Sequence, residues 1–142
     1  MALIGIACAS GAMLFVATLK TRSGGSALTT LAATQMINHK NAVIVDVRDA
    51  AEYSSGTLVG ARHIPLDTLA ARVGEINRFK GRPVILVCAS GNRSGRAVDV
   101  LVKAGFSEVY NLAGGVSSWG AAGLPLVKSG AEQSSSARKE KA

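Results

Sequence analysis

The sequence has few cysteines, few aromatic residues and few prolines, and each shortage excludes a class of protein. Two cysteines in 142 residues are too few for a disulfide-stapled scaffold or a four-cysteine zinc site. Aromatic residues make up 4% of the chain, which argues against a module that binds nucleic acid by base stacking. The three prolines and 16 glycines follow no three-residue period, so the chain is not collagen-like. Apolar residues make up 48%, a share that excludes a disordered chain and suits one compact domain.

Acidic residues are also scarce, and the net charge of +7 is spread unevenly. Residues 27–127 carry ten Lys and Arg against seven Asp and Glu, so more than half of the excess lies in the flanks. A basic tail over 128–142 could bind nucleic acid or an anionic membrane surface. A solvated tail without a partner is the simpler interpretation, so we predict a disordered basic tail and expect no nucleic-acid partner.

Charge is absent altogether from residues 2–19. Eighteen residues of helix span ~27 Å, close to the ~30 Å hydrocarbon core of a bilayer. Lys20 and Arg22 follow at once, and Ser-Gly-Gly-Ser occupies 23–26. The pattern predicts a transmembrane anchor over 1–22, with membrane contact through 2–19, and a flexible hinge over 23–26.

A cleaved signal peptide is the alternative interpretation of this segment. Only the N-terminal amine precedes the apolar run, and Ala7-Cys8-Ala9 comes too early to be a cleavage site. The positive charges after the run predict an outside N-terminus and a domain in the cytoplasm. A periplasmic domain is the alternative location.

From residue 27 onward, strand and helix patterns alternate. Short, β-branched apolar segments predict strands at 42–47, 62–64, 84–88 and 108–111. Helices are predicted at 31–38 behind Thr29 or Thr30, from Asp67 or Thr68 to about residue 79, and from Ser94 to a stop at Gly105. This alternation predicts an α/β domain with a parallel sheet of about five strands and helices on both faces.

A cysteine ends one of these predicted strands, and a short polar loop and a helix follow it. The segment reads Cys88, Ala89, Ser90, Gly91, Asn92, Arg93, Ser94. Such a loop can direct its N–H groups and the positive end of the next helix at one point, and Gly91 permits the turn. Arg93 and Arg96 add full positive charges. We therefore expect the pKa of Cys88 to lie below ~8.5, which favours a nucleophile over a buried small hydrophobe.

Other polar residues have milder interpretations. Asp46, Arg48 and Glu52 could act in catalysis, but a buried charge network beneath the loop is the simpler interpretation, because a buried carboxylate needs a partner. We interpret His63 as structural and Trp119 as a core residue.

The loop from Cys88 to Ser94 resembles the active-site loop of the single-domain rhodaneses, a family of sulfurtransferases. Three further segments resemble signatures of that family, in its order: Asp46-Val47-Arg48 with Glu52, Tyr53 and Gly56; residues 60–66 (GARHIPL); and residues 111–116 (NLAGGV) with Trp119, Gly123 and Pro125. The resemblance covers about 27–127 and implies a rhodanese-like fold. With the N-terminal segment, the chain resembles the membrane-anchored, YibN-like bacterial rhodaneses, which implies a single-pass protein of the inner membrane.

The resemblance implies a ping-pong reaction. Cys88 would take sulfane sulfur from a small anionic donor, thiosulfate or a persulfide, and pass it to a thiophilic acceptor such as a thiol. No metal or organic cofactor is implied. Four residues separate Cys88 from Arg93, one fewer than in related phosphatases, so a phosphatase or arsenate reductase is disfavoured. The usual histidine after Gly56 is Thr57 here, which we expect to affect packing.

A hypothesis of another class stays open from the sequence. The anchor, hinge and basic tail would also suit a membrane-associated interaction module that binds a membrane protein, with incidental sulfur chemistry.

Overall fold

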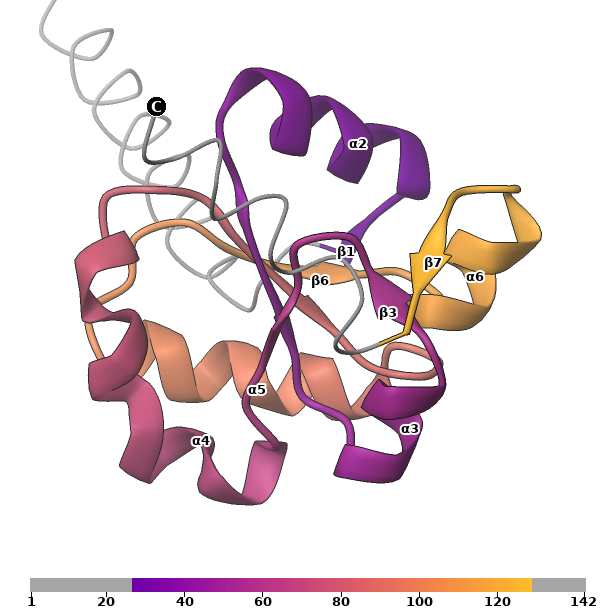
Figure 1. The fold of residues 1–142 in the computed structure, drawn as a ribbon. Helices are drawn as coiled ribbons and strands as arrows, with labels where there is room; N and C mark the ends of the chain where they lie inside the picture. The colour runs from indigo at the N-terminus through magenta and orange to yellow at the C-terminus, as the bar shows by residue number, and fades with distance from the viewer. Residues whose placement is uncertain (1–26, 129–142) are drawn as a thin grey trace, which may run out of the picture.

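The computed structural model describes residues 27–128 and contains a five-stranded parallel sheet, which confirms the predicted α/β class. The strands are β1 (Ala27–Leu28), β2 (Val43–Asp46), β4 (Arg62–His63), β5 (Val84–Val87) and β6 (Val109–Leu112), in the order β1-β6-β5-β2-β4 (Figure 1). The predicted anchor and hinge, and the tail beyond Lys128, lie outside the described residues. Within 27–128, no helix has the length and hydrophobicity to cross a bilayer.

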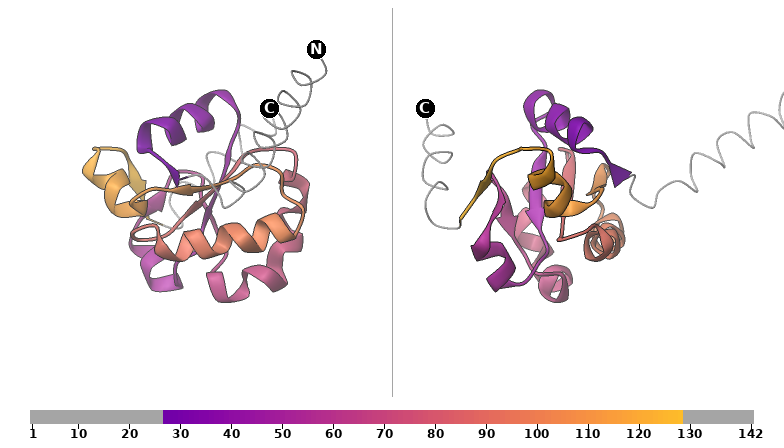
Figure 2. Two further views of the ribbon diagram at one scale, coloured as in Figure 1. Left: turned by 180° about the vertical axis from the view of Figure 1, so that it is seen from behind. Right: turned by 90° about the vertical axis from the view of Figure 1, so that its right-hand side faces the viewer.

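The helices lie on both sides of this sheet. They are α2 (Thr30–His39), α3 (Ala50–Ser55), α4 (Leu66–Arg72), the 3-10 helix η1 (Val73–Phe79), α5 (Asn92–Lys103) and α6 (Gly115–Ala121). Figure 1 shows α2 on one side of the sheet and α4 and α5 on the other, and the two views in Figure 2 agree. A separate antiparallel pair joins β3 (Thr57–Leu58) to β7 (Leu126–Val127).

Two of the predicted helix starts were wrong. The helix predicted behind Asp67 or Thr68 begins earlier, at Leu66, with Pro65 as its N-cap. The reason is that the Thr68 hydroxyl donates to the Pro65 carbonyl oxygen, 3.1 Å away, and does not accept from the backbone. α5 begins at Asn92 and not at Ser94, because Gly91 takes a φ of 102° and turns the chain into the helix. The first helix does follow Thr29, whose hydroxyl accepts from the Ala32 N–H.

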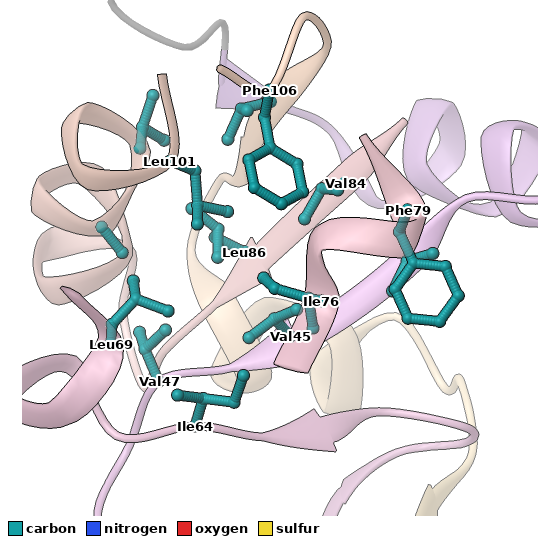
Figure 3. Close-up of a cluster of buried hydrophobic side chains, with 14 of the residues drawn as sticks. Val45, Val47, Ile64, Leu69, Ile76, Phe79, Val84, Leu86, Leu101 and Phe106 are labelled. Carbon is teal, nitrogen blue, oxygen red and sulfur yellow. The ribbon is translucent and has the colours of Figure 1, made fainter. Parts of the chain in front are cut away.

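The sheet separates two apolar cores. Alternate residues of the central strands point to opposite faces, so a strand buried on both sides must be apolar throughout. One core, under α4, η1 and α5, contains Val43, Val45, Val84 and Leu86 (Figure 3). The other, under α2 and α6, contains Ile44, Ile85, Val87 and Trp119. The continuous apolar pattern that predicted buried strands is thereby explained, and Trp119 is a core residue as expected.

α6 begins directly on the loop that follows β5. The N–H of Val116 donates to the Cys88 carbonyl oxygen at 2.9 Å, and the N–H of Ser117 donates to that of Ala89 at 3.2 Å. Gly115 allows this approach: its φ is +56°, and a Cβ there would overlap the Cys88 carbonyl oxygen and lie 2.8 Å from that of Ala89. The start of α6 therefore fixes the backbone at the start of the loop.

We predict that Gly115→Ala lowers the free energy of unfolding by about 2–4 kcal/mol, because it combines a strained φ with a backbone overlap. Gly74→Ala is the matched control, since a Cβ on Gly74 meets no atom within 4 Å; it should change stability by less than about 1 kcal/mol. Urea unfolding followed by the fluorescence of the single tryptophan, Trp119, measures both variants. Equal losses in the two variants would contradict the prediction.

Candidate active site

Cys88 lies at the carboxyl edge of the sheet, directly after β5, with 1% of its surface exposed. The loop folds back so that the Gly91 N–H donates to the Cys88 sulfur at 3.0 Å. The Ser94 hydroxyl, in the first turn of α5, lies 3.3 Å from the same sulfur. The loop thus directs two hydrogen-bond donors at one buried sulfur atom.

These donors lower the pKa of the Cys88 thiol. Burial is the largest single influence and raises the pKa, because it penalises the charged thiolate. The Ser94 hydroxyl and the backbone N–H groups of Ser94, Ser90 and Gly91 act in the opposite direction and together outweigh burial. The direction agrees with the sequence expectation, and its cause is the set of neutral dipoles of the loop.

Asn111, on β6, holds the loop in this shape. Its amide nitrogen donates to the Gly91 carbonyl oxygen at 3.0 Å, which directs its amide oxygen toward the Ser94 hydroxyl. A hydroxyl has one hydrogen to donate, so the Cys88 sulfur, the Gly91 carbonyl oxygen and the Asn111 amide oxygen compete for that of Ser94. Asn111 therefore holds Gly91 and Ser94 beside the sulfur, and its oxygen is also an alternative acceptor for the Ser94 hydroxyl.

Arg93 projects from the first turn of α5 to Glu52 on α3. Their side chains form a two-pronged ion pair, with N–O distances of 2.7 and 2.8 Å, and each is about one-third exposed. The Arg93 hydrogen bond lowers the pKa of Glu52 to about 2, so Glu52 is ionised at neutral pH. Arg96 is exposed on the following turn of α5.

Asp46 and Arg48 form the buried ion pair that the sequence suggested. Arg48 Nη2 lies 2.7 Å from Asp46 Oδ2, and the two side chains are 6% and 0% exposed. The Thr57 hydroxyl donates to Asp46 Oδ2 at 2.8 Å, and Arg48 also donates to the Gly56 carbonyl oxygen. Glu52, predicted to belong to this network, lies outside it and pairs with Arg93 instead. Thr57, which we expected to affect packing, is buried, and its hydroxyl also satisfies the buried carboxylate.

The remaining predicted residues lie around these groups. Ala89 is half-buried, whereas Ser90 and Asn92 are exposed at the tip of the loop. His63 Nε2 lies 2.7 Å from the Arg48 carbonyl oxygen, and its ring stacks on that of Tyr53 with the centroids 4.4 Å apart, which suits a structural histidine. In the part of the chain that the structure describes, no group of three or more His, Cys, Asp or Glu could hold a metal ion.

Two residues that shape the site were not predicted as site residues. Asn111 and Gly115 both lie in the segment that resembles the closing signature, and that resemblance was the signal that could have found them. Asparagine and glycine are not residue types that by themselves indicate a reactive site. The structure is therefore what reveals their contact with the Cys88 loop.

Comparison with known proteins agrees with this geometry. The family model of the rhodanese-like domain matches residues 29–122. YibN of Escherichia coli K12, an uncharacterized protein, is 38% identical over 97 residues, which are 68% of this chain and 68% of its own. A sulfurtransferase of Allochromatium vinosum is 34% identical, over 66% of this chain and 85% of its own.

Solved structures share the fold. The thiosulfate sulfurtransferase of Pseudomonas aeruginosa has a TM-score of 0.68 at 27% identity and covers 76% of this chain, which matches 21% of that protein. A rhodanese-related protein of Thermoplasma volcanium has a TM-score of 0.65 at 25% identity, over 72% of this chain and 97% of its own. The match to the family model, the identity to these relatives and the shared fold lead to one conclusion: the chain belongs to the rhodanese-like domain family.

Proposed function

We propose that the chain is a membrane-tethered sulfurtransferase that carries sulfane sulfur on Cys88. Membership of the rhodanese-like family, together with relatives named as sulfurtransferases, supports sulfur transfer in general terms. The observation that carries the proposal is the pair of donors, the Gly91 N–H and the Ser94 hydroxyl, directed at the Cys88 sulfur. Donors so placed stabilise negative charge on a thiolate or on a persulfide.

In the first step, the Cys88 thiolate attacks the outer sulfur of thiosulfate or of a persulfide donor. The bond between the two donor sulfurs breaks, and the inner sulfur leaves with the electron pair, as sulfite when thiosulfate is the donor. The new sulfur–sulfur bond makes Cys88 a persulfide with one negative charge on its terminal sulfur. No separate base is required, because the lowered pKa favours the ionised thiol.

In the second step, a nucleophilic acceptor attacks the terminal sulfur and releases the Cys88 thiolate. Cyanide gives thiocyanate, and a thiolate gives a new persulfide, so neither step consumes an oxidant or a reductant. Arg96 is exposed beside the loop, and we assign it the attraction of the anionic donor. Arg93 contributes less to that attraction, because Glu52 already neutralises it.

Cys88→Ser should reduce thiocyanate formation from thiosulfate and cyanide to below about one-thousandth, because the nucleophile is lost. Cys8→Ser is the matched control and should keep full activity, since it removes the other cysteine of the chain. Intact mass spectrometry after thiosulfate treatment should find one added sulfur atom in the parent chain and none in Cys88→Ser. Activity retained in Cys88→Ser would refute the proposed nucleophile.

The pH dependence of Cys88 alkylation tests the role of the loop dipoles. The lowered pKa means that the thiolate, the reactive form, is present at a lower pH than for an ordinary thiol. Ser94→Ala removes a donor to the sulfur, so it should move the midpoint of the rate–pH profile to higher pH. Ser90→Ala keeps its backbone N–H and should leave the midpoint in place. Identical profiles for the two variants would contradict the assignment of Ser94.

The proposed orientation, with residues 2–19 in the inner membrane and the domain in the cytoplasm, also has a direct test. Ser54 is exposed on α3, so Ser54→Cys in a chain with Cys8→Ser and Cys88→Ser provides a single accessible thiol. A membrane-impermeant maleimide should label it after lysis but not in intact spheroplasts. Labelling before lysis would place the domain in the periplasm, and a mature N-terminus beyond residue 10 would identify a cleaved signal.

A further inference from the structure

Six basic residues gather at the amino-terminal edge of the parallel sheet, opposite the Cys88 loop. They belong to the segments that lead into β2, β4, β5 and β6, and they are Lys40, Arg62, Arg78, Lys80, Arg82 and Lys103. In the connections described at this edge, residues 39–42, 59–62, 78–83 and 103–108, Glu108 is the only acidic residue. We call these six residues the basic edge.

Phe79 organises three of these side chains. The guanidinium groups of Arg62 and Arg78 each lie 4.7 Å from the centre of its ring, and that of Arg82 lies 5.0 Å from it. Phe79 is 5% exposed, and Figure 3 shows it at the end of the apolar cluster away from Val47 and Ile64. A buried ring thus holds three guanidinium groups close together, and such a concentration of positive charge attracts an anionic surface.

Neutralisation of helix dipoles does not account for the whole basic edge. Lys40, Lys80 and Lys103 lie at the ends of α2, η1 and α5, where a cation is favourable without any partner. Arg62 begins a strand, and Arg82 lies between η1 and β5. Arg82 Nε donates to the Asn41 carbonyl oxygen at 2.8 Å, which holds its side chain at this edge without neutralising its charge.

The chain enters the domain at the same edge. β1 begins at Ala27 and runs parallel to β6, so its first residue lies at the amino-terminal edge of the sheet. Seven residues lie between the apolar run 2–19 and Ala27, and the eight steps from residue 19 to residue 27 span at most ~29 Å in an extended chain. Lys20 and Arg22 lie within this short connection. If residues 2–19 are in a bilayer, the basic edge is therefore within reach of its headgroups.

The opposite edge has a different charge. Asp49, Glu52 and Asp67 lie at the start of α3 and α4, after β2 and β4, and they balance the charges of Arg48, Arg93 and Arg96 at the same edge. β5 separates the two edges by four residues, about 13 Å along the strand. The positive potential of the domain is thus greatest on the side where the chain enters.

We propose that the basic edge docks on the anionic phospholipid headgroups of the membrane that holds the chain, and so keeps the Cys88 loop facing away from the bilayer. The proposal rests on the proposed anchor at 2–19. It favours lipid over nucleic acid because the entry point of the chain fixes which surface the basic edge meets. Docking would leave the loop open to a soluble donor and acceptor.

The test uses the full chain in vesicles of phosphatidylcholine, with or without phosphatidylglycerol, that contain a lipid with a quencher in its headgroup. Both native cysteines are first replaced, through Cys8→Ser and Cys88→Ser. A single fluorophore is then attached either to Asn77→Cys, beside Arg78, or to Ser54→Cys, at the opposite edge. Phosphatidylglycerol should increase quenching at residue 77, and added salt should reverse the increase. Quenching at residue 54 should stay low in both vesicles.

Arg78→Gln with Arg82→Gln should abolish the increase, because the loss of two membrane-facing cations weakens docking by about 30-fold. Arg72→Gln with Lys128→Gln is the charge-matched control outside the basic edge, and it should keep the increase. Quenching that is independent of phosphatidylglycerol, or equal in the two double variants, would overturn the proposal. The basic edge would be a nucleic-acid surface instead if the parent chain bound an RNA oligonucleotide, the Arg78 and Arg82 variant did not, and phosphatidylglycerol had no effect on quenching.

Two controls separate this proposal from the proposed function. Flotation with phosphatidylcholine vesicles tests the anchor alone. If the chain does not float with them, docking is still supported when phosphatidylglycerol makes the parent chain float and does not make the Arg78 and Arg82 variant float. If phosphatidylglycerol has no effect on the parent chain either, docking is overturned. Thiocyanate formation in detergent tests the chemistry alone. It should be unchanged when Arg78→Gln and Arg82→Gln are made in the chain that retains Cys88.

Discussion

The parallel pairing of β2 with β5 is the contact on which the rest of the site depends. Asp46 pairs with Val87, so the chain leaves both strands at the same point of the carboxyl edge. The two connections then diverge, one toward β4 and the other toward β6, and such a divergence is where open α/β sheets bind ligands. A slip of one residue in this pairing would point the Asp46 side chain into an apolar core. It would also point the Cys88 sulfur away from the loop.

Hydrogen bonds from neutral groups are the main stabilisers of the Cys88 thiolate, and Arg93 adds a Coulombic interaction. Two arginines around the site are each held by a carboxylate: Arg48 by Asp46, and Arg93 by Glu52. The groups that contact the sulfur are the Gly91 N–H and the Ser94 hydroxyl. Fixed dipoles lower the pKa of the thiol without forming a strong ion pair with it. This suits the sulfur transfer that we propose for Cys88, in which the thiolate takes sulfur from an anionic donor and releases it to another nucleophile.

Much of the fold could be predicted from the sequence because the buried strands are apolar at every position and the helices alternate with them. The helix starts were misplaced because Pro65 and Gly91 act through backbone conformation, without side-chain caps. The Cys88 loop was predicted from residue types within seven positions. Its supports were harder to predict, because Glu52 and Arg93 are 41 residues apart and Asn111 reaches Gly91 from another strand. We wrongly assigned Glu52 to the Asp46 network because the two residues are close in sequence. The partner of Glu52 is Arg93, because α3 lies beside the start of α5.

A parallel sheet gives its two edges different chemistry, and this chain uses both. Every strand ends at the carboxyl edge, where helix starts direct N–H groups outward and can hold a thiolate. The helices α2, η1 and α5 end at the amino edge, where helix carbonyl groups favour cations, and Lys40, Lys80 and Lys103 lie there. Because β1 also begins at the amino edge, any attachment through the preceding residues holds the domain by the edge that lacks the reactive cysteine. The strand direction that places the Cys88 loop at the carboxyl edge thus also places it at the far edge from Ala27.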